Sequence, residues 1–203
     1  RAKRGPVSLV THETGTFLRQ EVADALGFLP RVEGASQPAP AAPAAAAPKP
    51  SLPQPVETAI QGVTLTPLKI IADDRGQVMH MLRQDSPVYQ RFGKFGEIYF
   101  SGIYQGVVKG WKVHSRSWSN LSVPAGRVKA TLYDAREGSP TKGATFEVVL
   151  GDHNYQLLTI PPGVALAWKG VAPMMSMVAN VASETHDPEE GKTLPLEAYP
   201  YKA

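Results

Sequence analysis

The 203-residue sequence predicts an all-β domain with a double-sheet jelly roll, preceded by a short helix and an Ala/Pro-rich linker. From residue 57 onward, short apolar or alternating runs recur and no long helical period appears. Turns rich in glycine and proline separate these runs, in keeping with a total of 18 glycines and 19 prolines. The segment 57–203 also has the length that two packed sheets of short strands require.

The N-terminal segment, residues 1–33, contains one candidate amphipathic helix at Thr16–Phe28. Within it, Phe17, Val22 and Leu26 recur at near-helical spacing. A single helix of this length is not stable alone, because its apolar face has nothing to pack against. We therefore expect it to dock either on the main domain or on a protein partner.

Residues 34–56 form the predicted linker. Positions 34–55 contain eight alanines and seven prolines, and almost no side chain that could enter a core. Such a composition favours an extended, partly polyproline-II spacer that reaches about 3.1 Å per residue. Two interpretations stay open: a disordered tail, and a tether that carries the docking helix.

The main domain, residues 57–203, is predicted to consist of short strands. Turn sequences such as Asp74-Arg75-Gly76 and Pro161-Pro162-Gly163 set their boundaries, since proline and glycine interrupt the alternation there. The expected strands are Val63–Ile71, Val78–Leu82, Glu97–Tyr104, Val107–His114, Leu121–Val123, Arg127–Tyr133, Thr145–Leu150, Gln156–Ile160, Val164–Trp168 and Met174–Val181.

The composition argues against several classes of function. Without cysteine the chain has no disulfide, thiolate metal site or cysteine nucleophile, which fits a cytoplasmic location. A net charge of +3, with no stripe of Lys and Arg, predicts no nucleic-acid partner. No apolar run approaches the ~20 residues that cross a bilayer, so no membrane span is expected.

Four segments, in sequence order, carry a resemblance to a known family. They are Asp73–Gly76 (DDRG), Gly106–His114 (GVVKGWKVH), Tyr133–Pro140 (YDAREGSP) and Ile160–Gly163 (IPPG). In these motifs the main domain resembles the cupins of the dTDP-4-dehydrorhamnose 3,5-epimerase family, including the related sugar 3,4-ketoisomerase branch. The resemblance implies a cupin-type jelly roll, a homodimer paired through edge strands, and a nucleotide-sugar ligand.

Two functions follow from this resemblance and stay open. The first is a nucleotide-sugar epimerase or ketoisomerase that acts on a 4-keto-6-deoxyhexose nucleotide by proton abstraction next to the keto group. The second is a catalytically degenerate cupin that binds a sugar nucleotide or serves as a structural or interaction subunit of a larger assembly. The second is suggested because the family's catalytic histidine corresponds to Lys112 in the segment Lys109-Gly110-Trp111-Lys112.

The ligands of metal-binding cupins are mostly replaced in this chain. Of the four ligand positions, only His114 keeps a histidine; the others carry Lys112, Trp118 or Ser119, and Leu166. Lysine and leucine cannot take the place of imidazole around a divalent cation. We therefore expect no metal and no other cofactor, in line with the metal-free epimerases that the motifs resemble.

Lys112 and His114 are the candidate catalytic residues. Side chains two apart on a strand share one face, so both would face the substrate. Histidine is the usual base near neutral pH, and a lysine beside it can stabilise an enolate. Alternatively Lys112 is itself the base, or both residues merely line the mouth of the cupin. The family's proton-donating tyrosine falls near Val178, and the carboxylate partner of its base finds no match.

Three further residues are candidates for substrate binding. The resemblance implies that Arg75 contacts the pyrophosphate, which suits its planar fork of donors. Lys109 stands where the family has an arginine that helps to bind the substrate, and it keeps the positive charge. Trp111 is a candidate for stacking on the base or the sugar.

Overall fold

The computed structural model describes residues 10–12, 15–17 and 51–202. The chain divides into two compact units, residues 1–49 and 50–203. In the first unit, β1 (Val10–His12) pairs antiparallel with β2 (Gly15–Phe17).

The N-terminal helix expected over Thr16–Phe28 is only partly within the described residues. Its first two residues, Thr16 and Phe17, lie in strand β2, and residues 18–28 lie outside the described part of the chain. Of the expected linker, the structure describes residues 51–56 alone. The docking helix and the tether therefore stay predictions.

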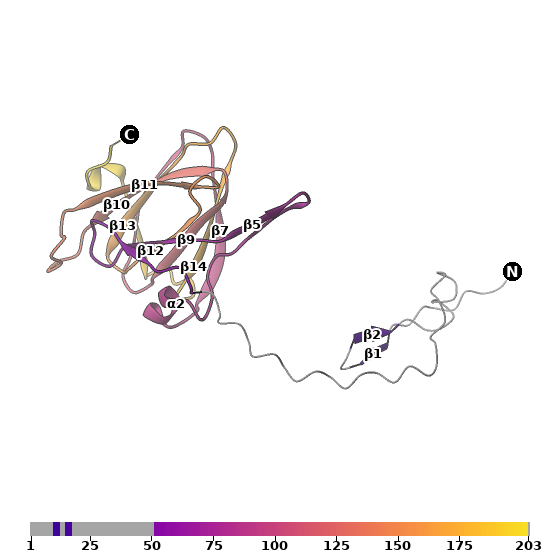
Figure 1. Cartoon of the computed structure of the whole chain (residues 1–203). Helices are drawn as coiled ribbons and strands as arrows, with labels where there is room; N and C mark the ends of the chain where they lie inside the picture. Colours follow the sequence, from indigo (N-terminus) through magenta and orange to yellow (C-terminus); the bar gives the residue numbers. More distant parts are fainter. Residues whose placement is uncertain (1–9, 13–14, 18–50, 203) are drawn as a thin grey trace, which may run out of the picture. The chain divides into compact units, whose positions relative to one another are not determined.

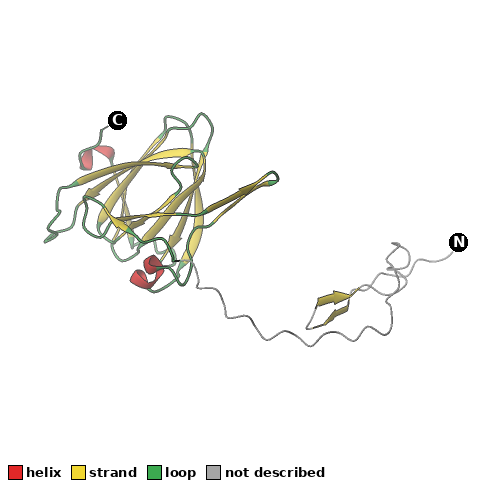
Figure 2. Ribbon diagram, viewed as in Figure 1, coloured by secondary structure: helices red, strands yellow, loops and turns green. Residues whose placement is uncertain are grey.

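Within the second unit, residues 51–202 form a sandwich of two antiparallel sheets, which confirms the predicted all-β jelly-roll class (Figures 1 and 2). One sheet has five strands in the order β11-β10-β13-β8-β15. Their bounds are β8 (Val108–His114), β10 (Arg127–Asp134), β11 (Thr145–Gly151), β13 (Val164–Gly170) and β15 (Gly191–Leu194).

The second sheet has six strands in the order β3-β4-β12-β9-β14-β7. Their bounds are β3 (Val56–Glu57), β4 (Thr64–Pro67), β7 (Glu97–Ile103), β9 (Ser119–Ala125), β12 (Gln156–Ile160) and β14 (Ser176–Ala182). A separate hairpin, β5 (Ile70–Asp73) and β6 (Gly76–Met79), projects from the sandwich (Figure 1).

The structure departs from the expected elements at several points. The run Val63–Ile71 divides into β4 and β5, and strand β15 lies in a segment for which no strand was predicted. Helix α2 (Pro87–Phe92) and the 3-10 helix η1 (Leu196–Ala198) were not predicted either. Among the described residues, no helix combines the length and the apolarity needed to cross a membrane.

The main core lies between the two sheets. Inward-facing side chains from alternate strand positions fill it, which is the arrangement expected for packed sheets. It includes Leu121, Val123, Leu132, Leu158 and Ile160, all nearly or fully buried. A smaller cluster, around Trp111, Ala165 and Ala167, covers the other face of the five-stranded sheet under residues 194–201.

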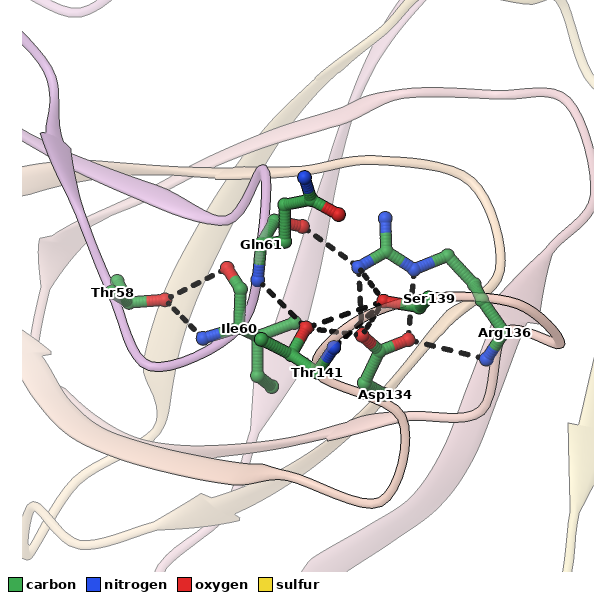
Figure 3. Close-up of polar contacts among 7 residues, drawn as sticks. All are labelled: Thr58, Ile60, Gln61, Asp134, Arg136, Ser139 and Thr141. Atoms are coloured by element: carbon green, nitrogen blue, oxygen red, sulfur yellow. Dashed lines mark hydrogen bonds and ion pairs between the residues drawn. The ribbon is translucent and has the colours of Figure 1, made fainter.

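A buried carboxylate, Asp134 at the end of β10, organises the turn Tyr133–Pro140 (Figure 3). It accepts hydrogen bonds from the Arg136 guanidinium at 2.8 Å and from the hydroxyls of Ser139 and Thr141 at 2.7 Å each. The Arg136 guanidinium also donates to the Gln61 carbonyl at 2.7 Å, which ties this turn to the segment before β4.

This hydrogen-bonded turn also supports the loop that follows β12. The Arg136 hydrogen bond lowers the pKa of Asp134 against the opposing effect of burial, so the carboxylate stays ionised. Gly163 has φ +81° and lies so close to Arg136 that a Cβ there would be 2.6 Å from its Cγ. The Gly163 amide donates to the His114 carbonyl at 2.7 Å, so the turn and the end of β8 are held together.

We predict that Asp134→Ala lowers the free energy of unfolding by about 3 kcal/mol, because it leaves the Arg136 guanidinium and two hydroxyls without their acceptor. Urea denaturation monitored by circular dichroism measures this loss. Asp152→Ala removes an exposed carboxylate and is the control, with an expected change below about 0.5 kcal/mol. Equal effects of the two substitutions would contradict the structural role of Asp134.

Candidate active site

A cavity of about 440 Å³ lies between the two sheets. One wall comes from β8 and β13 of the five-stranded sheet, and the opposite wall from β7, β9 and β14 of the six-stranded sheet. Its volume falls in the range of small-molecule sites. Apolar side chains make up most of the surface: Ile103, Leu121, Ile160, Val164, Leu166, Trp168 and Val178.

The structure brings Lys109, Lys112 and His114 to this cavity. His114 and Lys112 share a face of β8, as the period of two predicts. Strict alternation would turn Lys109 to the other face. Instead, the β8–β13 register shifts, since Leu166 pairs with Lys112 and Trp168 with Lys109. This β-bulge adds one residue to β8 and turns Lys109 into the cavity.

Glycine at position 110 allows strand β15 to approach β8 closely. A Cβ at Gly110 would lie 2.9 Å from the Leu194 carbonyl oxygen, so the close approach of β15 requires a residue without a side chain.

Trp111 lies on the other face of β8 and does not line the cavity. Its side chain is fully buried, and its indole N–H donates to the Leu196 carbonyl at 3.0 Å. Tyr199 and Tyr201 pack edge-on against its ring. The indole thus anchors the C-terminal segment to the sheet, and the expectation that Trp111 stacks on the substrate is not met in this arrangement.

Arg75 is also absent from the cavity of its own chain. It lies at the turn between β5 and β6, with its side chain 84% exposed and paired with Asp73. It lines a separate surface hollow formed by the hairpin itself. Within one chain, the structure therefore does not bring Arg75 together with Lys112 and His114.

His114 forms a pair with Glu190, which the sequence did not reveal. His114 Nδ1 lies 2.6 Å from Glu190 Oε2, and the Glu190 side chain is only 5% exposed. Glu190 Oε1 accepts hydrogen bonds from the backbone amides of Arg116 and Ser117, each at 2.8 Å. The carboxylate is thus held from two sides at the corner after β8.

These contacts determine the protonation of the pair. Burial alone would raise the pKa of Glu190, but the hydrogen bonds from His114 and from the amides of Arg116 and Ser117 outweigh it and lower that pKa to about 2. An ionised carboxylate can only accept, so His114 Nδ1 must donate to it. The lone pair of a neutral His114 then lies on Nε2.

Tyr99 lies on the opposite wall, on β7. Its hydroxyl oxygen accepts a hydrogen bond from Asn180 Nδ2 at 2.7 Å, and Asn180 also lines the cavity. Because the oxygen is the acceptor in this contact, the hydroxyl proton of Tyr99 stays available to a ligand. The expected tyrosine position, Val178, is occupied by an apolar wall residue of the neighbouring strand β14.

A second cavity of about 430 Å³ adjoins the first and shares Tyr99, Lys112, His114 and Ser117 with it. Its other side chains include three carboxylates, Glu97, Glu184 and Asp187, besides Glu190. In the part of the chain that the structure describes, no three His, Asp or Glu side chains gather in a way that could hold a metal ion.

Comparison with known proteins identifies the family. The family model described as dTDP-4-dehydrorhamnose 3,5-epimerase matches residues 57–198. This match covers most of the chain and contains the cavity residues described above. The chain therefore belongs to this family, as the motifs in its sequence predicted.

Individual relatives agree with this assignment. The probable low-salt glycan biosynthesis epimerase Agl13 of Haloferax volcanii is 32% identical over 132 residues, which are 64% of this chain and 83% of that protein. A dTDP sugar isomerase from Desulfovibrio desulfuricans G20 has a similar structure, with a TM-score of 0.69, 39% identity, and coverage of 72% of this chain and 94% of that one.

A third relative was solved with a ligand. The dTDP-6-deoxy-D-glucose-3,5-epimerase RmlC of Legionella pneumophila, in complex with dTDP-4-keto-L-rhamnose, has a TM-score of 0.63 and 26% identity. The alignment covers 70% of this chain and 77% of that one. By their descriptions, these relatives are a probable glycan biosynthesis epimerase, a dTDP sugar isomerase and a dTDP-sugar epimerase.

We predict that Glu190→Gln removes about 3 kcal/mol of stability near neutral pH, because the lowered pKa of Glu190 favours the folded state. The contribution is complete above the ordinary pKa of 4.5 and is lost as the pH falls from there toward about 2. The difference in unfolding free energy between parent and variant should therefore shrink over that range. Urea titrations near pH 7 and at about pH 3 measure it.

The matched control for this prediction is Glu189→Gln, which alters the exposed neighbouring carboxylate. It should stay within about 0.5 kcal/mol of the parent near neutral pH. A pH-independent difference between parent and Glu190→Gln would show that the carboxylate's charge does not supply the stability.

Proposed function

We propose that this protein is a nucleotide-sugar epimerase or ketoisomerase that removes and returns a proton next to the keto group of a 4-keto-6-deoxyhexose nucleotide. The observation that carries this proposal is the placement of a His114–Glu190 pair and Tyr99 on opposite walls of one cavity. A base on one side of a sugar ring and an acid on the other are what inversion at carbon requires.

His114 acts as the base in this proposal. Glu190 keeps the proton on Nδ1, so that Nε2 can accept the proton from the carbon next to the keto group. As the imidazole becomes charged, the ionised Glu190 stabilises it. His114 replaces the base that the family carries at the position of Lys112, two residues earlier on the same face of β8.

Lys112 and Tyr99 complete the proposed chemistry. Lys112 supplies the positive group that faces the keto oxygen as negative charge develops there. Tyr99 donates its hydroxyl proton to the opposite face of the carbanion, and the Asn180 amide stabilises the tyrosinate that remains. Return of the proton to the face from which it left gives exchange alone, whereas delivery from Tyr99 gives the epimer.

The diphosphate is proposed to lie near Lys109 and away from the second cavity. Glu97, Glu184 and Asp187 line that second cavity, and their negative charges would repel a diphosphate. Arg75 can assist Lys109 only from a second copy of the chain, because within its own chain it lies at the hairpin turn. Its role in phosphate binding thus depends on a homodimer.

The surface around β7 supports such a homodimer. Strand β7 is an edge strand, and the side chains of Ile98 and Phe100 on it are 51% and 62% exposed. Tyr104 and Met174 add further exposed apolar area, as do Ile71 and Val78 on the projecting hairpin: all four are substantially exposed. Pairing of this edge with a second copy would cover these groups.

Location and further partners are inferred from the substrate and the sequence. A cytoplasmic site is proposed because sugar nucleotides are made and used there and the chain has no cysteine. We also propose a protein partner that binds the N-terminal segment.

The alternative function, a catalytically degenerate cupin, predicts ligand binding without proton exchange.

We predict that the parent incorporates deuterium from D₂O into dTDP-4-keto-6-deoxy-D-glucose next to the keto group, and that His114→Ala lowers this rate by at least about 100-fold. Tyr99→Phe should keep much of the exchange but lose inversion, because the proton can still return to the face from which His114 took it. Proton NMR of the recovered sugar nucleotide follows both events.

His153→Ala, on an exposed turn, is the control for His114→Ala and should leave exchange unchanged. Tight binding of the sugar nucleotide with no exchange in the parent would reject the epimerase proposal in favour of the binding protein.

The homodimer is tested by mixing two defective variants. Arg75→Ala alone should weaken dTDP binding about ten- to a hundredfold, since it removes a charge-assisted contact. If Arg75 acts on the partner's cavity, heterodimers of Arg75→Ala and His114→Ala chains contain one intact site. Random mixing should then restore about a quarter of the parental exchange rate. A sedimentation mass of a single chain, or no recovery on mixing, would contradict the shared site.

A further inference from the structure

We propose that Lys112 is a covalent catalyst, which condenses with the keto group of the substrate to form an iminium ion. This inference rests on the proposed function, since it assigns a chemical step to the same cavity. It differs from a role in which Lys112 stabilises an enolate by its charge alone. The contacts of Lys112 and of its neighbours support this inference.

Lys112 is a half-buried lysine without a partner. Among the residues that the structure describes, it makes no hydrogen bond and no ion pair. Its cross-strand neighbours are Leu166 and Thr193. It lines the first, mostly apolar cavity and also the second cavity, whose carboxylates Glu97, Glu184 and Asp187 make no ion pair with it. An amine that no side chain of its own chain engages is free to meet a ligand, and active-site lysines of this kind form Schiff bases with carbonyl substrates.

The end of the Lys112 side chain lies against Gly191. A Cβ at Gly191 would lie 2.8 Å from Lys112 Nζ and 2.9 Å from its Cε, so any larger residue would displace the amine. The same point lies 3.3 Å from His114 Cε1. The amine and the imidazole therefore both approach Gly191. Because they make no hydrogen bond with each other, a proton would pass between them through a water molecule.

The position of the base also favours the covalent role. The His114–Glu190 pair already provides a base whose tautomer is set by its hydrogen bond to the carboxylate. Lys112 is then free for a different task. An iminium nitrogen carries a full positive charge on the atom bonded to the former carbonyl carbon, so it withdraws electrons from the neighbouring C–H bond more strongly than a hydrogen bond to the keto oxygen.

Formation of the iminium ion needs no reagent besides the substrate, Lys112 and His114. The Lys112 ammonium gives a proton to His114, and the free amine adds to the carbonyl carbon to form a carbinolamine. His114 returns that proton to the carbinolamine hydroxyl, which leaves as water while the C=N⁺ bond forms. Neutral His114 then takes the proton from the adjacent carbon, and an enamine results. Reprotonation at carbon and addition of water release the ketone and restore Lys112.

Trapping with sodium cyanoborohydride tests this proposal. The parent is incubated with dTDP-4-keto-6-deoxy-D-glucose and the reductant, and intact-mass and peptide analysis follow. The expected result is an increase by the mass of the sugar nucleotide less one oxygen atom, located on Lys112. Lys192→Arg, which alters a lysine of β15 away from the cavity, is the control and should be labelled as the parent is.

Exchange measurements on Lys112→Arg and Lys112→Met separate the covalent step from the proposed function. Arginine keeps the positive charge but forms no iminium, so deuterium exchange should fall at least about 100-fold in both variants. Thermal unfolding and dTDP binding check that each variant is folded, and methionine is included because arginine must fit beside Gly191. Exchange in the parent without an adduct, or exchange in folded Lys112→Arg within about threefold of the parent, would overturn the iminium step and leave the epimerase intact. Absence of both exchange and adduct would reject both.

Discussion

The carboxylate of Glu190 connects the fold of this protein to its chemistry. One oxygen accepts hydrogen bonds from two backbone amides at the corner after β8, and the other accepts a hydrogen bond from the imidazole N–H of His114. The C-terminal segment continues from Glu190 directly into β15, which pairs with β8 along the residues that line the cavity. A single buried anion therefore holds the end of β8, the start of β15 and the proton of the candidate base in fixed relation.

The rest of the site follows from how two sheets deliver different groups to one cavity. The five-stranded sheet brings the cationic and basic side chains, because the β-bulge at Gly110 places Lys109 on the same side as Lys112 and His114. The six-stranded sheet brings Tyr99 and Asn180. Asp134 supports the site indirectly. The turn that it stabilises packs against Gly163, and the Gly163 amide donates a hydrogen bond to the His114 carbonyl. Because the two sheets face each other across the cavity, a sugar ring bound there would have His114 on one face and Tyr99 on the other.

The fold was predictable because its signals are local. Alternation and turn residues specified most strands of the main domain, and the period of two placed Lys112 beside His114. Helix α2 carried its own signals, since Ser86 caps it, Pro87 begins it and Gly93 ends it with φ +69°, but six residues are too few for a helical period.

The site was only partly predictable, because its remaining features are long-range. Glu190 contacts His114 across 76 positions of sequence, and Tyr99 meets Asn180 across 81. A β-bulge depends on how two strands pair, so the sequence of β8 alone gave no reason to turn Lys109 inward. The expected substrate contact of Trp111 failed for another reason: the period of two, counted from Lys112, places Trp111 on the opposite face of β8. The carboxylate after His186-Asp187-Pro188 could have been noticed as a partner for a lone histidine, but only once β15 was known to pair with β8.

A measurement of the His114 tautomer directly tests whether Glu190 keeps the proton on Nδ1 and leaves Nε2 free to act as a base. Long-range ¹H–¹⁵N correlation spectra of the ¹⁵N-labelled protein at neutral pH distinguish a protonated Nδ1 from a protonated Nε2, and His114→Ala assigns the signals. We expect a proton on Nδ1 and a lone pair on Nε2 in the parent, and the opposite tautomer in Glu190→Gln because the amide donates to Nδ1. A parent His114 that carries its proton on Nε2 would contradict it.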